Sequence, residues 1–174
     1  SLADSWSHHI ISSVTTSDEL IYIRNPYSIM DYADMDGDAD QDILSIDFQQ
    51  YELFWYENAG EYDSEWQSHA VYTFQFPPKS ITSCDIDMDG DIDILATLVS
   101  KCIWIENPGI SNNGWNSHTI IDEQDFKYLN VEIARASDID LDGDIEVVMA
   151  EFWKADNHTL FVFDSSRTNP VTLN

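Results

Sequence analysis

The chain contains the stretch Asp34-Met-Asp36-Gly37-Asp38-Ala39-Asp40-Gln-Asp42-Ile43-Leu44, and this stretch recurs twice without gaps. The second copy is Asp85-Ile-Asp87-Met-Asp89-Gly90-Asp91-Ile-Asp93-Ile94-Leu95, and the third is Asp138-Ile-Asp140-Leu-Asp142-Gly143-Asp144-Ile-Glu146-Val147-Val148. The copies begin 51 and 53 residues apart, and each opens with nine positions that carry five acids. A period of this length is typical of repeat architectures in which every repeat is one supersecondary unit. We call the segments 34–42, 85–93 and 138–146 the first, second and third acidic loops, and we number their positions 1 to 9.

The rest of the composition narrows the class of protein. The 174 residues include 33 acids and 7 bases, for a net charge of −26, and 13% of them are aromatic. Such a charge excludes nucleic acid and anionic membrane surfaces as partners, because both attract basic patches. No apolar run approaches the roughly 18 residues of a membrane-spanning helix, and the aromatic content excludes a disordered acidic chain. We therefore expect an acidic globular protein of about one domain, without nucleic-acid binding or membrane insertion.

Two further motifs repeat between the acidic loops. Trp-x-x-His occurs three times, ending at His9, His69 and His118. Trp-x-Glu-Asn-x-Gly occurs at 55–60 and 104–109, and its third copy has decayed to Leu-Phe-Val-Phe-Asp at 160–164. Because a residue that recurs once per repeat usually serves the repeated scaffold, we expect these histidines and the glutamates of the second motif to be structural.

Short apolar runs predict an all-β chain. The runs are β-branched or aromatic and are bounded by Asn, Gly, Asp or Pro, as strands usually are. They predict twelve strands, at 9–12, 28–31, 43–46, 53–56, 70–73, 81–84, 94–97, 102–105, 118–121, 131–134, 147–150 and 160–163. Each acidic loop joins the first two strands of a four-stranded unit. The strand at 9–12 belongs by this pattern to a sheet whose other three members come last.

The acidic loops predict metal binding. Five carboxylates within nine residues repel one another unless a cation neutralises them. Oxygen ligands without His or Cys select a hard ion, namely Ca²⁺, Mg²⁺ or Mn²⁺. An EF-hand is excluded, because position 12 would require Glu and is Ser45, Ala96 or Met149. A solvated acidic turn would not repeat one register three times.

The three loops differ at two positions. Position 6 is glycine in the second and third loops but Ala39 in the first, where a left-handed backbone would cost about 1 kcal/mol. We therefore expect the first loop to be the weakest site. Glu146 replaces Asp at position 9 of the third loop, which changes the reach and the denticity of that ligand.

These residues resemble the FG-GAP/VCBS repeat, the blade unit of integrin α-subunit propellers, of fungal propeller lectins and of many bacterial surface proteins. The resemblance extends from Trp6 to about Asp164 and implies a β-propeller with one Ca²⁺ per blade, about three per chain. It implies as metal ligands Asp34, Asp36, Asp38, Asp40 and Asp42; Asp85, Asp87, Asp89, Asp91 and Asp93; and Asp138, Asp140, Asp142, Asp144 and Glu146. It also implies a secreted or otherwise extracytoplasmic location.

Three four-stranded blades do not close a propeller, which has typically four to eight. With repeat units at about 26–77, 78–126 and 127–165, we predict a homodimer that closes a six-bladed ring. In it, strand 6–13 of each chain would complete the last blade of its partner, which is an isologous exchange. The alternative is that the chain is a fragment of a longer propeller.

Two classes of function remain open. We favour a calcium-binding module for adhesion or lectin-like binding, with a carbohydrate or protein ligand, because the sequence shows repetition rather than a unique polar cluster. The alternative is the propeller, catalytic or not, of a polysaccharide-degrading enzyme, although we recognise no catalytic constellation. Trp55 and Trp104 are expected to pack between sheets, while Trp153 has no counterpart in the other repeats and is a candidate for ligand contact.

Overall fold

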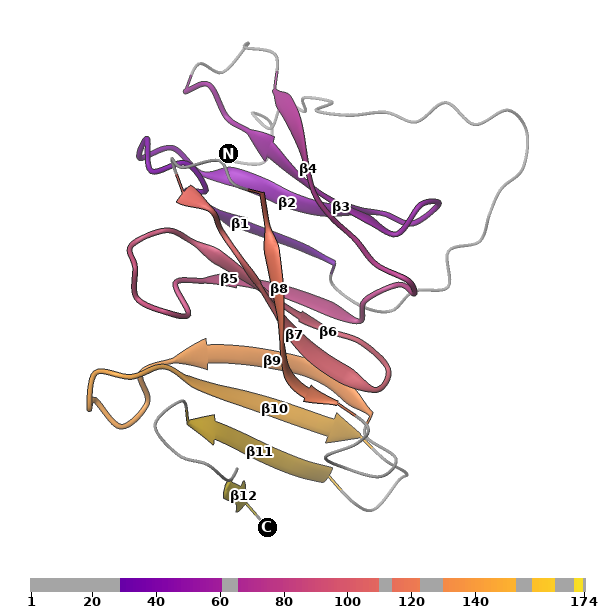
Figure 1. Cartoon of the computed structure of the whole chain (residues 1–174), viewed down its shortest axis with the longest axis vertical. Helices are drawn as coiled ribbons and strands as arrows, with labels where there is room; N and C mark the ends of the chain where they lie inside the picture. The colour runs from indigo at the N-terminus through magenta and orange to yellow at the C-terminus, as the bar shows by residue number, and fades with distance from the viewer. Residues whose placement is uncertain are drawn as a thin grey trace, which may run out of the picture.

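The computed structural model describes residues 29–60, 66–109, 114–122, 130–152, 158–164 and 171–173, and all of its regular structure is β. Its strands are β1 (Met30–Ala33), β2 (Asp42–Asp47), β3 (Glu52–Glu57), β4 (Gln67–Thr73), β5 (Ser80–Cys84), β6 (Asp93–Thr97), β7 (Lys101–Glu106), β8 (Asn116–Asp122), β9 (Val131–Ser137), β10 (Glu146–Phe152), β11 (His158–Asp164) and β12 (Val171–Leu173). They form three antiparallel sheets with the orders β1-β2-β3-β4, β5-β6-β7-β8 and β12-β11-β10-β9, called here the first, second and third sheets (Figure 1). In this part of the chain we find no helix with the length and hydrophobicity needed to cross a membrane.

The predicted strands agree with the observed ones. Eleven of the twelve predicted segments overlap a strand, and the remaining one, at 9–12, lies outside the described residues. Each acidic loop joins the first two strands of its sheet, as expected. The predicted all-β class and the four-stranded units are therefore confirmed.

The third sheet differs from the prediction in its last strand. We expected residues 6–13 of a partner chain beside β11, but β12 of the same chain lies there, and the sheet continues beyond the expected end at 165. The pairing sets Leu173 opposite Leu160 and Val171 opposite Val162. A segment close in sequence reaches this edge with little loss of loop entropy, which favours it over a distant strand. Residues 6–13 themselves lie outside the described residues.

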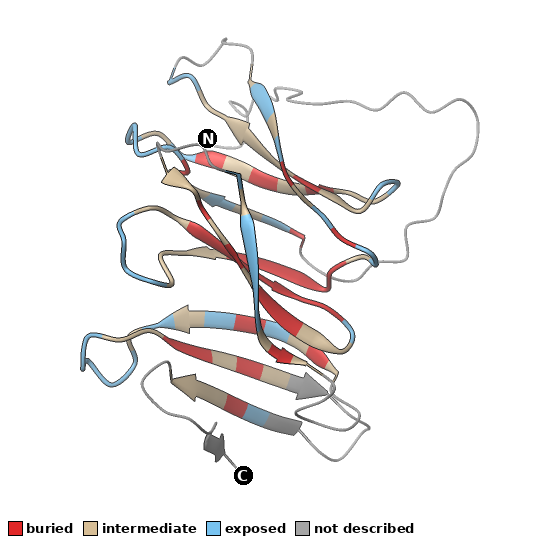
Figure 2. Cartoon of the chain, viewed as in Figure 1, coloured by how far each residue is buried: buried red, intermediate tan, exposed pale blue. Residues whose placement is uncertain are grey.

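The core consists of two clusters, one on each side of the second sheet. Consecutive residues of β6 contribute to opposite sides, because successive side chains of a strand point to opposite faces. Ile94 packs in the cluster shared with the first sheet, and Leu95 packs in the cluster shared with the third. All five residues of β6 are buried, as Figure 2 shows for the middle of the molecule. The second sheet is thus enclosed between the other two.

The three sheets are stacked in chain order through their first strands. β1 contacts β5, and β9 contacts both β5 and β6. All three acidic loops consequently emerge along the same edge of the stack, at the left of Figure 1. The two cysteines, Cys84 and Cys102, lie on β5 and β7 with β6 between them, and both are free thiols.

Candidate metal centres

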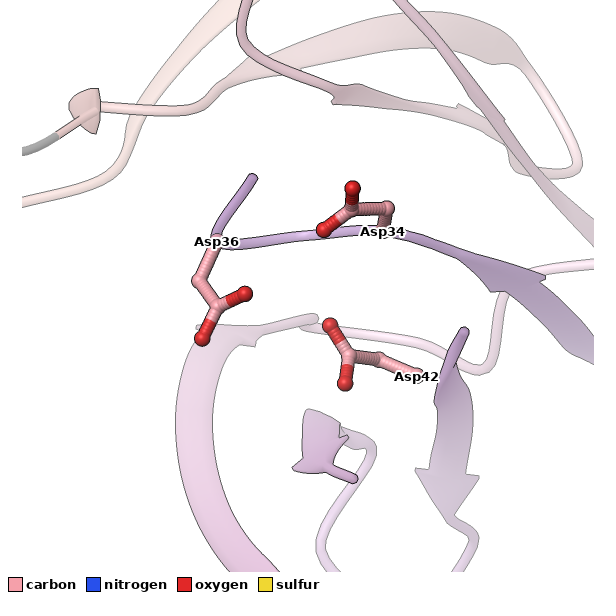
Figure 3. Close-up of side chains that lie close together, drawn as sticks. All are labelled: Asp34, Asp36 and Asp42. Carbon is pink, nitrogen blue, oxygen red and sulfur yellow. The ribbon is translucent and has the colours of Figure 1, made fainter. Parts of the chain in front are cut away.

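Each acidic loop brings three of its five acids together, from positions 1, 3 and 9. The clusters are Asp34, Asp36 and Asp42; Asp85, Asp87 and Asp93; and Asp138, Asp140 and Glu146. In each cluster one carboxylate oxygen from every residue lies within 4.8 Å of the others. Figure 3 shows the first cluster, in which the three side chains surround one common space. Each group could hold a metal ion.

The acid at position 9 is the buried member of each cluster. It is the first residue of the second strand, and the exposed fraction is 1% for Asp42, 1% for Asp93 and 3% for Glu146. Backbone N–H groups hold it in place. Asp42 accepts hydrogen bonds from the N–H groups of Met35 at 2.9 Å and Asn58 at 2.8 Å. A carboxylate placed there requires compensation, because burying a charge without a partner is costly.

The second cluster has the same supports. Asp93 accepts hydrogen bonds from the N–H groups of Ile86 at 3.0 Å and Asn107 at 2.8 Å. Burial nevertheless raises the pKa of Asp93 to about 6, because these two hydrogen bonds offset only part of the lost solvation. Partial burial also raises the pKa of Asp36 and Asp87, and neighbouring carboxylates raise it further. In each case desolvation is the largest cause, because burial disfavours the charged form of the carboxyl group.

Among the residues that the structure describes, three buried carboxylate oxygens accept no hydrogen bond: Oδ1 of Asp85, Oδ1 of Asp138 and Oε1 of Glu146. All three belong to the clusters, at positions 1 and 9. The other oxygen of Glu146 accepts from the Ile139 N–H at 2.7 Å, so the side chain is held while Oε1 stays unpaired. Buried charged oxygens are normally hydrogen-bonded, paired or bound to a metal. The donor set therefore fits a hard cation.

The remaining acids, at positions 5 and 7, lie outside the clusters. At position 5, Asp38, Asp89 and Asp142 each accept a hydrogen bond from the N–H of position 7, at 2.9, 2.9 and 3.1 Å. At position 7, the carboxylates of Asp40 and Asp91 lie against the turn glycines Gly60 and Gly109, where an added Cβ would meet them. Of the fifteen predicted ligands the structure thus brings nine together. Ligand roles for the other six stay a prediction.

The loop backbone enters the left-handed region twice, at positions 4 and 6. The φ angles at position 4 are 78° for Gly37, 59° for Met88 and 62° for Leu141, and those at position 6 are 79° for Ala39, 98° for Gly90 and 101° for Gly143. Each loop therefore has one glycine and one strained residue with a side chain. The expected strain at Ala39 is present, but Gly37 offsets it, since the other loops carry their strain at position 4. Strain thus gives no reason for the first site to be the weakest.

Hydrogen bonding does distinguish the first loop. Oδ1 of Asp34 accepts from the Gly37 N–H at 2.8 Å, and Oδ2 accepts from the Ala39 N–H at 3.0 Å. In the second loop only Oδ2 of Asp85 is used, by the Gly90 N–H at 3.1 Å. The position-1 oxygen that is unpaired in the other two loops is satisfied by the backbone in the first.

The Asn-x-Gly turn completes the site, a role that the sequence analysis did not assign to it. Besides its N–H, Asn107 donates from its side chain to the carbonyl oxygens of Ile92 at 2.9 Å and of Met35 at 3.2 Å. The second of these bonds ties the turn of the second sheet to the first acidic loop. The repeated Trp-x-Glu-Asn-x-Gly motif was the signal that could have revealed this support.

The Trp-x-x-His histidines belong to a structural cluster on the third and fourth strands. His69 stacks on Trp55 with ring centroids 4.3 Å apart, and its Nε2 lies 2.8 Å from Glu57 Oε2. His118 repeats this arrangement with Trp104 at 4.5 Å and Glu106 at 2.7 Å. These contacts fit the predicted scaffold role of the two histidines, which stays a prediction. His9 and Trp153 lie outside the described residues.

Stacked four-stranded sheets with a carboxylate cluster at each first hairpin define the class: an all-β repeat protein with candidate cation sites. Residues 34–96 match the family model described as FG-GAP-like repeat, which confirms the resemblance to FG-GAP/VCBS repeats over that segment. The match runs from the start of the first acidic loop through the second loop into β6. The curated proteins contain no significant match, and neither do the solved structures.

Proposed function

We propose that the chain forms part of a calcium-binding β-propeller, with one Ca²⁺ in each acidic loop and a homodimer completing the ring. The observation that carries the calcium proposal is the cluster of three acids that recurs in all three loops, together with the buried oxygens of the second and third clusters that accept no hydrogen bond. Ca²⁺ suits these sites better than Mg²⁺, because Ca²⁺ accepts many oxygen ligands in irregular geometry, whereas Mg²⁺ requires a near-ideal octahedron and retains several waters. An ion would be held by the acids at positions 1, 3 and 9 of each loop.

We further propose that this propeller acts as a binding or adhesion module for a carbohydrate or protein ligand. The three sites share one edge of the stack, so bound ions would stiffen three neighbouring loops at once (Figure 1). Loops that a rigid scaffold positions are common places for binding. Repetition of the same geometry supports multivalent binding.

Calcium binding is tested by calorimetric titration of chelator-treated protein. We expect about three Ca²⁺ per chain, with Mg²⁺ competing weakly. The variant Asp85→Asn, Asp138→Asn should lose two of the three sites, whereas the charge-matched control Glu52→Gln, Asp47→Asn should lose none. Wild-type protein that binds no Ca²⁺ would overturn the proposal.

The ligand is tested on a glycan array and a panel of extracellular-matrix proteins, each probed with Ca²⁺ and with EDTA. We expect retention that depends on Ca²⁺ and that is weakened in the Asp85→Asn, Asp138→Asn variant. Retention of the same strength in EDTA would refute a role for the ions in binding.

A further inference from the structure

Each sheet has a backward face, toward the preceding sheet, and a forward face, toward the next one. The backward face of the first sheet has no preceding sheet among the described residues, and the forward face of the third sheet has no following one. We call these two surfaces the end faces. The strand register identifies the side chains on each of them.

The end face of the first sheet is apolar. The strand register forms one row of neighbouring residues from Tyr32, Ile43 and Tyr56. A second row on the same face consists of Met30, Ser45 and Phe54. Met30 is 63% exposed and Tyr32 is 70% exposed. Large exposed apolar side chains that are contiguous on one face indicate an interaction site, whereas scattered ones do not.

The second sheet shows what normally covers such a face. Shifting Met30, Ile43, Phe54 and Tyr56 by one repeat gives Ile81, Ile94, Ile103 and Ile105. These four isoleucines are between 0% and 3% exposed, and they pack against the first sheet. The end face therefore occupies the positions that are fully buried one repeat later. The forward face of another sheet is its natural complement.

The end face of the third sheet supplies such a surface. Register aligns Ile133, Ala150 and Leu160 in one row and Arg135, Val148 and Val162 in the next. Ile133 is 38% exposed and Leu160 is 43% exposed. Val148 occupies the position that Leu95 has in the preceding repeat. Leu95 is 1% exposed and packs forward against the third sheet.

We propose that a second copy of this chain covers the end faces, with the third sheet of each copy stacked on the first sheet of the other. This inference rests on the proposed propeller and specifies how it closes. A head-to-tail contact makes a ring if its rotation closes, and two copies of three sheets give six blades, within the usual four to eight. The contact joins sheet faces and requires no exchange of strand 6–13, whose expected place is taken by β12.

Light scattering on the purified chain is the first test. We expect about 40 kDa, twice the chain mass of 20.0 kDa, at micromolar concentration. A monodisperse 20.0 kDa species would overturn the proposal, including the case in which residues 1–28 of the same chain cover the face. If that monomer still bound Ca²⁺, the calcium proposal would stand while the ring failed.

Apolar contact is tested separately. Leu160→Glu, on the end face of the third sheet, should dissociate the dimer. Val99→Glu is the matched control, because Val99 is 58% exposed in the turn between β6 and β7, away from both end faces. Equal effects of the two substitutions would contradict the assigned surface.

Discussion

Replacing Glu146 with glutamine should change stability in opposite directions with and without calcium. Glu146 is 3% exposed, its Oε2 is held by the Ile139 N–H, and its Oε1 has no hydrogen-bond donor. Without metal, this unpaired charge destabilises the fold. The amide of Glu146→Gln keeps an acceptor for Ile139 and gains N–H donors that can reach Asp138 and Asp140 in the same cluster.

The magnitude follows from the cost of an unsatisfied buried group, about 1–3 kcal/mol. For a chain of this size, 1 kcal/mol corresponds to roughly 2–4 °C in Tm. In EDTA we therefore expect the variant to melt a few degrees above the wild type. With Ca²⁺ at a hundredfold excess over its Kd, the wild type gains about 2.7 kcal/mol per site. Because the variant loses most of that gain at the third site but keeps the relief of at least about 1 kcal/mol, it should melt at most roughly 3–7 °C below the wild type.

The assay is thermal melting followed by circular dichroism, in EDTA and in Ca²⁺. Glu52→Gln is the control, because it removes one charge at the first residue of β3, which pairs with the last residue of β2 and not with the acidic loop. It should shift both melts equally. A decrease of the same size for Glu146→Gln in both buffers would refute the reasoning, since it would show loss of packing rather than relief of an unpaired charge.

Three further predictions concern pH, turn geometry and the scaffold. Since the pKa of Asp93 is raised to about 6, its proton competes with Ca²⁺, and affinity at the second site should fall about tenfold per pH unit below 6 in calorimetric titrations. Because the folded pKa is higher than the unfolded one, the same group makes the metal-free protein more stable as pH falls from 7 toward 4, which melts in EDTA would show. Gly109→Ala adds a Cβ against a carboxylate as well as left-handed strain, so it should destabilise more than Gly114→Ala, which adds only about 1 kcal/mol of strain in open space; urea unfolding compares them. His118→Ala should lower stability by about 1 kcal/mol through loss of the Trp104 stack and leave the calcium stoichiometry unchanged, and a loss of bound calcium would contradict its scaffold role.

The repeat pattern of the sequence was sufficient for the secondary structure. Hydrophobic runs of strand length, punctuated by the same acidic loop, predicted eleven strands in the correct place. The short β12 was missed because Val-Thr-Leu is too brief to stand out, and only its pairing with β11 makes it a strand. Alternation within a strand likewise could not tell which face of a sheet meets a neighbour and which is left open.

The sequence alone determined that each loop concentrates five acids in one register, and hence that it favours a hard cation, because charge and residue type are properties of the chain itself. Only the tertiary structure decided which of them converge. Two left-handed residues per loop direct positions 1, 3 and 9 toward one point and engage position 5 in the loop's own backbone, while the Asn-x-Gly turn of another strand fixes position 9. Backbone dihedral angles and contacts between distant strands set the directions of these acidic side chains. Neither the angles nor the contacts can be derived from the order of the residues alone.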